Sequence, residues 1–237
     1  MRSVIFDLDG TLADTSGDLI AAANAAFGAL DLPVRLDPAR DAGTALRGGR
    51  AMLRLGLSRL EPDGAGTADG AGAADGTATG DEALIDRGYP ILLQAYGDQI
   101  ARHTVLYPGA VAAVEALRGA GYAVGICTNK PEGLAEALLT ELGVRDLFAS
   151  LIGADTLAMR KPDPEPLREA VRRAGGDPAR SLLVGDSVTD RRTAEAAGVP
   201  CVLVTFGPSG DDMAALAPEA LLEDFADLPA VVGRLIG

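Results

Sequence analysis

The stretch Val4-Ile5-Phe6-Asp7-Leu8-Asp9-Gly10-Thr11 joins a short apolar run to two carboxylates. A run with no polar residue between the apolar ones is typical of a strand that is covered on both faces. Asp7 and Asp9 stand at i and i+2 of an extended chain, so we expect both side chains to point to the same side. Gly10 then allows the backbone to leave the strand sharply. The segment therefore predicts a buried first strand that ends in an acidic turn.

Further apolar runs follow the same pattern and alternate with segments whose apolar residues recur at three and four. The runs span 122–127, 151–153, 181–184, 200–205 and, more weakly, 220–222, and the helical segments span 111–117, 134–142, 166–173 and 189–197. This alternation predicts an α/β fold with a doubly wound, Rossmann-like parallel sheet between layers of helices. Because ligands bind at the carboxyl ends of the strands in such sheets, the residues that follow each strand are the candidates for function.

One interval breaks this alternation. Between residues 14 and 103 no strand pattern occurs, whereas four amphipathic segments do, at 19–30, 39–46, 51–60 and 82–100. A connection of this length is far longer than an ordinary loop. We therefore predict an all-helical domain over 14–103, inserted into an α/β core of 1–13 and 104–237 and overhanging the site end of the sheet. Within it, 61–80 is low in complexity and holds no side chain suited to a core, which predicts a flexible linker.

Composition narrows the classes of function. The 237 residues include 34 acidic and 21 basic ones, for a formal net charge of −13, which argues against a general nucleic-acid surface. No apolar run reaches the ~18 residues of a membrane span. The first apolar stretch ends at once on Asp7, so no signal peptide is expected. We expect a cytoplasmic protein whose partner is neither a nucleic acid nor a membrane.

The other strand ends add a second set of polar residues. Thr128-Asn129-Lys130-Pro131 follows the second run, Lys161-Pro162 follows the third, and Gly185-Asp186 with Asp190 follows the fourth. The sheet would then gather Asp7, Asp9, Asp186 and Asp190 with Thr128 and Lys161. Carboxylates this close repel one another unless a cation compensates them. Oxygen ligands alone suit Mg²⁺, so the sequence predicts a magnesium site at this edge of the sheet.

The chemistry of these side chains points to phosphoryl transfer. Only two of the 21 basic residues are lysines, Lys130 and Lys161, and both follow predicted strands. Lys is a compact point charge that Arg does not replace at a crowded phosphate. With Mg²⁺ and Lys161 neutralising a phosphate dianion, Asp7 can attack phosphorus as a nucleophile and form an aspartyl-phosphate. Asp9 is placed to protonate the leaving oxygen and later to take a proton from water, while Thr128 stabilises the transferring group.

These residues resemble the four motifs of the haloacid dehalogenase superfamily of phosphatases, and the resemblance covers essentially the whole chain. The motifs appear in order as Asp7-Leu8-Asp9-Gly10-Thr11, Thr128-Asn129, Lys161-Pro162, and Gly185-Asp186 with Asp190. The resemblance implies that Asp7 is the nucleophile and Asp9 the general acid and base. It also implies that Asp7, the backbone carbonyl of Asp9, and Asp186 hold Mg²⁺, with Asp190 orienting them. Residues 14–103 stand where the family carries a helical cap.

Details within the motifs narrow the expected reaction. Dehalogenases lack the second carboxylate of the first motif, so Asp9 argues against them, and Thr11 stands where sugar phosphomutases of the β-phosphoglucomutase type usually carry Val. Stretches such as Tyr107-Pro108-Gly109 look most like phosphoglycolate phosphatases. The same resemblance implies that Asn129 and the cap segment Arg47-Gly48-Gly49 bind substrate. We therefore expect a Mg²⁺-dependent phosphatase of a small phosphorylated metabolite, with 2-phosphoglycolate favoured. The alternatives are a β-phosphoglucomutase-type phosphomutase, or a phosphatase of sugar phosphates or nucleotides.

Overall fold

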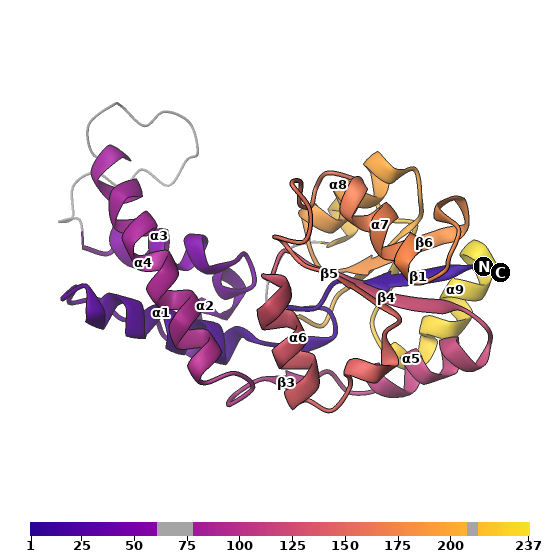
Figure 1. The fold of residues 1–237 in the computed structure, drawn as a ribbon, viewed down its shortest axis with the longest axis horizontal. Coiled ribbons are helices and arrows are strands. Elements are labelled where there is room, and N and C mark those ends of the chain that lie inside the picture. The colour runs from indigo at the N-terminus through magenta and orange to yellow at the C-terminus, as the bar shows by residue number, and fades with distance from the viewer. Residues whose placement is uncertain (61–77, 208–212) are drawn as a thin grey trace. The chain divides into compact units, whose positions relative to one another are not determined.

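The computed structural model describes residues 1–60, 78–207 and 213–237, and the chain divides into two compact units (Figure 1). One unit comprises Met1–Thr15 and Thr104–Gly237, and the other comprises Ser16–His103. The sequence analysis placed these boundaries after residue 13 and before residue 104. The linker predicted over 61–80 lies outside the described residues except for 78–80, which begin a helix.

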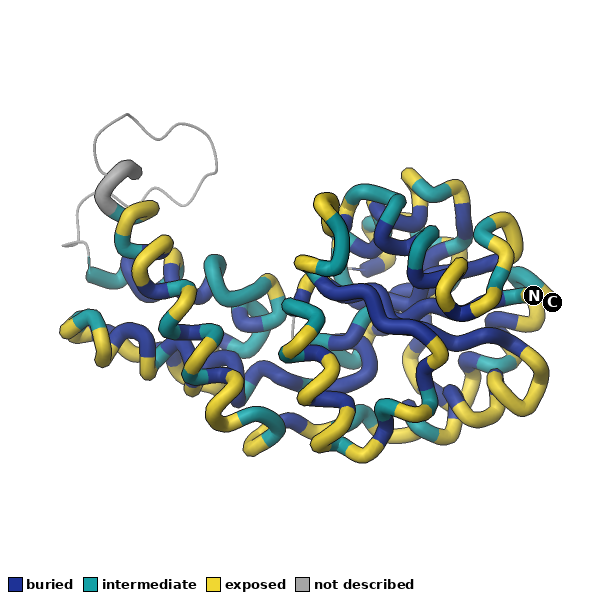
Figure 2. The backbone as a smooth tube through the Cα atoms, in the orientation of Figure 1, coloured by how far each residue is buried: buried dark blue, intermediate teal, exposed yellow. Residues whose placement is uncertain are grey.

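The first unit is built on a six-stranded parallel sheet, which confirms the predicted α/β class. Its strands are β1 (Ser3–Phe6), β4 (Ala123–Cys127), β5 (Ser150–Ile152), β6 (Ser181–Gly185), β7 (Cys201–Val204) and β8 (Ala220–Leu222). All six lie on apolar runs that the sequence analysis assigned to strands. Every residue of β1, β4, β5, β6 and β7 is buried, because helices cover both faces of the sheet (Figure 2).

The strand order places one pair of strands where a ligand is expected. The order is β5-β4-β1-β6-β7-β8, which in chain order of the six strands reads 3-2-1-4-5-6, the Rossmann arrangement. Ser3 of β1 lies opposite Ala123 of β4 on one side and Ser181 of β6 on the other. The chain therefore winds outward from β1 to β5 and then returns to β6, and the reversal falls between β1 and β6. Ligands of such sheets bind beyond the carboxyl ends of the strands at this reversal.

Helices fill the two layers beside the sheet. They are α5 (Ala110–Gly119), α6 (Glu132–Glu141), α7 (Glu165–Arg173), α8 (Val188–Ala197) and α9 (Leu228–Ile236), with short 3₁₀ turns η1 (Arg145–Leu147), η2 (Pro178–Arg180), η3 (Met213–Leu216) and η4 (Phe225–Asp227). In the first unit α7 packs against α8 on one face of the sheet, and α5 packs against α9 on the other. The four helices that the sequence analysis expected are present. It missed α9 and the two-stranded ribbon of β2 (Ala13–Asp14) and β3 (Val105–Leu106).

The second unit is all-helical within its described residues. It contains α1 (Ser16–Ala29), α2 (Pro38–Ala45), α3 (Gly49–Ser58) and α4 (Ala78–Asp98). α1 packs against each of the other three, and its core includes Phe27, Met52 and Leu92, all nearly inaccessible to solvent. Asp37 caps α2 by accepting the backbone N–H groups of Ala39 and Arg40. In the described parts of both units, no helix combines the length and the apolar character that a membrane span requires.

An ion pair between a buried carboxylate and a partly exposed arginine stabilises the helical unit, and its loss gives a first test. The carboxylate of Asp41, 3% exposed, accepts hydrogen bonds from both terminal nitrogens of Arg59 at 2.9 and 2.6 Å, which lowers the pKa of Asp41 to about 2. A carboxyl whose folded pKa is depressed stabilises the fold at neutral pH, and that contribution is lost as pH falls through the folded pKa. We expect Arg59→Met to lower the free energy of unfolding by about 2 kcal/mol at pH 7, and by much less at and below about pH 2, in urea denaturation.

The matched control removes a neighbouring cation that is exposed. Arg40 lies 3.5 Å from the same carboxylate but is 67% exposed, so solvent screens it. Arg40→Met should lower the free energy of unfolding by less than about 0.5 kcal/mol. Equal losses of unfolding free energy in Arg59→Met and Arg40→Met would contradict the larger contribution that we assign to the less exposed Arg59 pair.

Candidate active site

Asp7 stands where β1 ends, beside the end of β6. Its backbone N–H donates to the carbonyl of Val184 at 2.9 Å, which extends the pairing of the two strands by one residue. Its Oδ1 accepts the backbone N–H of Leu8 at 2.7 Å, and its Oδ2 lies 3.0 Å from Nζ of Lys161. The side chain is 13% exposed. The strand therefore presents one carboxylate, anchored on both oxygens, at the predicted edge of the sheet.

The chain leaves β1 through a tight turn. The backbone N–H groups of Thr11, Leu12 and Ala13 all donate to the carbonyl of Leu8, at 3.0 to 3.3 Å. Gly10 takes a φ of 81°, in the left-handed region that favours glycine. This turn fixes the backbone between Asp7 and Thr11, as the sequence predicted for Gly10.

A second pair of carboxylates comes from the end of β6 and the first turn of α8. Asp190 is fully buried, and its Oδ2 accepts the hydroxyl of Ser187 at 2.6 Å and the backbone N–H of Asp186 at 3.3 Å. Its Oδ1 accepts a hydrogen bond from Lys161 at 2.7 Å. A Cβ on Gly185 would lie 2.4 Å from the Cβ and Cγ atoms of Asp190. Only glycine at 185 therefore lets α8 bring Asp190 so close to the end of the strand.

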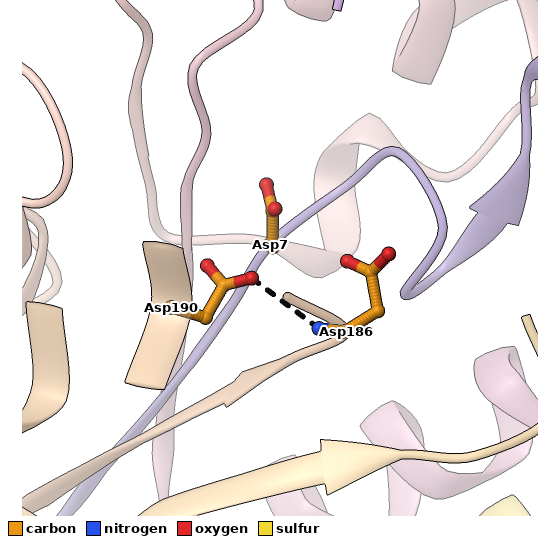
Figure 3. A group of neighbouring side chains, drawn as sticks. All are labelled: Asp7, Asp186 and Asp190. Carbon is orange, nitrogen blue, oxygen red and sulfur yellow. Dashed lines mark hydrogen bonds between the residues drawn. The ribbon is translucent and has the colours of Figure 1, made fainter. Parts of the chain in front are cut away.

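The structure brings three of the predicted acidic residues together. One oxygen from each of Asp7, Asp186 and Asp190 lies within 4.8 Å of the others (Figure 3). Burial, opposed by Lys161 and reinforced by Asp190, raises the pKa of Asp7 to about 6. Burial and the nearby carboxylates of Asp190 and Asp7 raise the pKa of Asp186 well above its ordinary value. The folded protein thus holds these carboxylates ionised only against an electrostatic penalty.

Lys161 compensates part of this negative charge. Its ammonium group is 1% exposed and lies between Asp190 and Asp7. Although burial by itself lowers the pKa of Lys161, the carboxylates of Asp190 and Asp7 raise it overall, so the side chain stays charged. Asp190 is fully buried and binds Lys161 and Ser187, whereas Asp7 is 13% exposed, so Asp7 and Asp186 are the carboxylates that could also hold a cation. This hard oxygen donor set fits Mg²⁺.

Thr11 is a site residue whose part the sequence analysis missed. Its side chain is completely buried, and its hydroxyl donates to Oδ1 of Asp186 at 3.0 Å. A valine in its place could not make this hydrogen bond. The sequence analysis treated Thr11 only as a mark of one subfamily. The sequence offered one signal for this role: Thr11 places a hydroxyl in the turn after Asp7, directly before the apolar pair Leu12-Ala13.

The carboxylate of Asp9 is not one of the three in this cluster, although its charge acts on Asp7 and helps to raise the pKa of that residue. Its Oδ1 accepts a hydrogen bond from Nζ of Lys130 at 2.9 Å, and the two side chains are 17% and 4% exposed. β1 ends at Phe6, so Asp9 stands in the turn that follows the strand. The sequence analysis placed Lys130 after a predicted strand but predicted no contact with Asp9.

The second motif holds the loops of the site together. Thr128 is buried, its backbone N–H donates to the carbonyl of Ile152 at 2.9 Å, and its hydroxyl accepts the backbone N–H of Lys130 at 3.2 Å. Nδ2 of Asn129 donates to the backbone carbonyl of Lys161 at 3.0 Å. Asn129, which the resemblance assigned to substrate, therefore also supports the loop that carries Lys161.

The predicted substrate residues of the cap lie at the start of α3. Arg47 is exposed, Gly48 precedes the helix with a φ of 97°, and Gly49 is its first residue. A Cβ on Gly49 would lie 3.0 Å from the ring of Tyr89, so a small residue here lets α3 pack on α4. Arg50, one position on, binds Asp86 of α4 at 2.6 Å. Contact of Arg47, Gly48 and Gly49 with substrate stays a prediction.

The motif resemblance implied this architecture: a Rossmann-like sheet with carboxylates directly after β1 and β6, and Lys161 brought to them by the loop after β5. The chain belongs to the haloacid dehalogenase-like hydrolases, since the model of that family matches residues 1–198. The predicted membership of this superfamily is confirmed.

Its relatives define a narrower group. The chain is 39% identical over 222 residues to the phosphoglycolate phosphatase of Mesorhizobium japonicum, covering 94% of this chain and 90% of that protein. It is 41% identical over 232 residues to the phosphoglycolate phosphatase of Rhodospirillum rubrum, covering 96% and 89%. A crystal structure from Haemophilus somnus, described as that of a predicted phosphoglycolate phosphatase, superposes with a TM-score of 0.79 at 26% identity, covering 98% and 97%. These relatives confirm the prediction of an enzyme that hydrolyses phosphoric monoesters.

Proposed function

We propose that the protein is a Mg²⁺-dependent phosphatase that hydrolyses 2-phosphoglycolate through a phosphorylated Asp7. The observation that carries this proposal is the setting of Asp7, whose carboxylate is bound to the buried ammonium of Lys161 and lies next to Asp186. A nucleophile for phosphate needs such a cation beside it, because the carboxylate and the dianionic substrate repel each other. The names of the relatives in Mesorhizobium japonicum and Rhodospirillum rubrum support the choice of substrate.

The chain's own residues supply the nucleophile and the proton transfers. In the first step an oxygen of Asp7 attacks phosphorus, the bond from phosphorus to the ester oxygen breaks, and Asp9 gives the leaving alcohol its proton. In the second step water attacks phosphorus, Asp9 takes a proton from it, and the bond from phosphorus to Asp7 breaks, which releases inorganic phosphate. Lys161 and the hydroxyl of Thr128 bind the phosphoryl oxygens during both steps.

The proposal includes magnesium because the candidate ligands are all oxygen atoms, which Mg²⁺ prefers. Asp7, Asp186 and the backbone carbonyl of Asp9 would hold the ion, while Asp190 orients Lys161 and the end of β6. The raised pKa values of Asp7 and Asp186 support it, because carboxylates that repel one another in a buried site favour a cation between them. The bound ion would supply positive charge that offsets the charge of the phosphoryl group.

The helical unit completes the proposal as a cap that closes on the substrate. The chain crosses between the units twice, and the β2–β3 ribbon pairs Ala13 with Leu106 beside these crossings. We place the hinges of cap motion at 13–16 and 102–108. In the helical unit, Arg47, with Gly48 and Gly49 shaping its turn, would bind the carboxylate that distinguishes phosphoglycolate from other phosphoesters. In the core, Asn129 is the residue of the second motif that we expect to contact substrate.

A panel of phosphorylated metabolites, assayed for phosphate release with Mg²⁺ and with a chelator, tests the function. We expect 2-phosphoglycolate to give the highest kcat/KM, and chelation to reduce it by about 10³-fold or more. Preference for a sugar phosphate or a nucleotide would overturn the choice of substrate. Isomerisation of a hexose 1-phosphate without free phosphate would replace the phosphatase by a phosphomutase.

The hydrogen bond from Thr11 to Asp186 gives a prediction about metal affinity. Thr11→Val removes the donor that orients Asp186, and losing such a support of a metal-binding carboxylate costs about 10- to 100-fold in affinity. We expect the Mg²⁺ concentration for half-maximal phosphate release to rise by that factor, and the thermal stabilisation by Mg²⁺ to shift with it. Thr193→Val is the control, because that buried hydroxyl donates to the carbonyl of Thr189 within its own helix. Unchanged magnesium dependence in Thr11→Val would contradict the proposed role of Asp186.

A further inference from the structure

The two lysines of the chain each bind one of the two aspartates in the turn after β1. Lys161 lies 3.0 Å from Asp7, and Lys130 lies 2.9 Å from Asp9. The proposed function uses Lys161 for the phosphoryl group but leaves Lys130 without a part. A lysine that is 4% exposed, in a chain whose other basic residues are nearly all arginines, calls for a specific role.

The backbone of Lys130 is fixed on both sides. Its N–H donates to the hydroxyl of Thr128 at 3.2 Å, and its carbonyl accepts the N–H of Ala154 at 2.9 Å. The first contact ties it to the end of β4 and the second to the loop after β5. The ammonium that contacts Asp9 therefore belongs to a side chain that is nearly inaccessible to solvent and whose backbone is anchored.

Asp9 in turn reaches the accessible part of the site. Its side chain is 17% exposed, comparable to the 13% of Asp7. The Lys130 contact engages Oδ1. Without it the carboxylate could rotate about two side-chain bonds, whereas proton transfer requires the two heavy atoms to approach within about 2.6–3.2 Å. A displacement of about 1 Å at a reacting group can cost 10²-fold in rate.

We infer that Lys130 is a positioning residue that holds the Asp9 carboxylate where it can pass a proton to and from the reacting oxygen. This inference deepens the proposed function and rests on it. Lys130 acts through Asp9, so its contribution is present only where Asp9 transfers a proton. A compact ammonium suits this place, because a guanidinium fork would not fit a single oxygen at so buried a position.

The leaving group separates this role from a general structural one. The alkoxide leaving from 2-phosphoglycolate needs a proton, whereas p-nitrophenolate leaves without one. We expect Lys130→Met to slow the pre-steady-state release of glycolate by about 10- to 100-fold, and that of p-nitrophenol by less than about 3-fold. Arg145→Met, which removes a partly exposed cation paired with Glu136, is the control and should leave the ratio of the two rates unchanged.

A double-mutant cycle tests whether Lys130 works through Asp9. In an Asp9→Asn background, Lys130→Met should cause no further loss in glycolate release, because the group it positions is gone. Additive losses, or equal losses with both leaving groups, would overturn the inference while leaving the phosphatase intact. A wild-type enzyme that hydrolyses neither substrate would instead defeat the proposed function itself.

Folding of the variants is checked by thermal melting without metal. If Lys130→Met melts far below the wild type, the measurements are repeated with Lys130→Gln, which keeps a hydrogen-bond donor near Asp9. That variant should lose less of the alkyl ester reaction than Lys130→Met and show the same leaving-group dependence. Failure of both variants to fold would show that the pair serves stability and would overturn the positioning role.

Discussion

The Asp7→Asn variant is expected to lose at least about 10⁴-fold in phosphate release while folding more stably than the wild type in the absence of metal. The loss of turnover follows because an amide oxygen does not attack phosphorus as a carboxylate does. The gain in stability follows from the pKa of Asp7, which burial raises to about 6. One residue thus carries opposite effects on activity and on stability, as is common for groups held in an active site.

The sign of the stability effect follows from proton linkage. A carboxyl whose pKa is higher in the folded protein than its ordinary value of 3.8 destabilises the fold when ionised. This penalty is absent below about pH 4 and complete above about pH 6. Asn carries no such penalty, so at about pH 8 the metal-free variant should be more stable by about 1–3 kcal/mol, and near about pH 4 the difference should vanish.

Thermal melting in chelator and phosphate release with Mg²⁺ measure the two effects on the same preparation. Asp146→Asn is the matched control, because it makes the same chemical change on an exposed residue of η1. It should keep wild-type turnover and melting. An Asp7→Asn enzyme with normal hydrolysis would remove the nucleophile from the proposal, and one that is less stable at high pH would contradict the burial penalty.

Much of the fold was predictable because a parallel sheet buries its strands on both faces. The runs that became β1, β4 and β6 are short, continuous and largely apolar, and runs of this kind are typical of strands covered on both sides. The β2–β3 ribbon escaped prediction because each strand has two residues, too few for any periodicity. The helix α9 was missed because it follows β8, the strand with the weakest apolar run, and carries no functional motif.

The candidate site was predictable where its residues directly follow strands and not where loops take over. Asp7 and Asp186 sit one residue beyond β1 and β6, so the topology alone brings them together. The partner of Asp9 was not predictable, because its contact with Lys130 joins the turn after β1 to the loop after β4. The hydrogen bond from Asn129 to the carbonyl of Lys161 joins two loops, and no pattern in the sequence specifies such a contact.

Lys161→Met is expected to reduce both activity and stability, in contrast to Asp7→Asn. The ammonium is 1% exposed and binds Asp190 at 2.7 Å and Asp7 at 3.0 Å. Methionine matches the length of the lysine stem but leaves three carboxylates within 4.8 Å of one another without their buried cation. Removing one partner of a buried ion pair costs about 3–5 kcal/mol, and we expect a loss of that size in the metal-free protein at neutral pH. Turnover should fall by about 10³-fold, because the phosphoryl group loses its cation.

Conditions that remove the repulsion among the carboxylates test the origin of the stability loss in Lys161→Met. Lowering the pH should restore part of the stability lost in Lys161→Met, since protonated carboxylates no longer repel one another. Adding Asp7→Asn to Lys161→Met should restore stability but not turnover. Lys161→Arg should not substitute, because the guanidinium is too large for this enclosed position. Arg160→Met, which removes the exposed cation next in the chain, is the control and should melt as the wild type does. A Lys161→Met protein with unchanged melting would show that the three carboxylates need no cation, which would undercut the case for metal at this site.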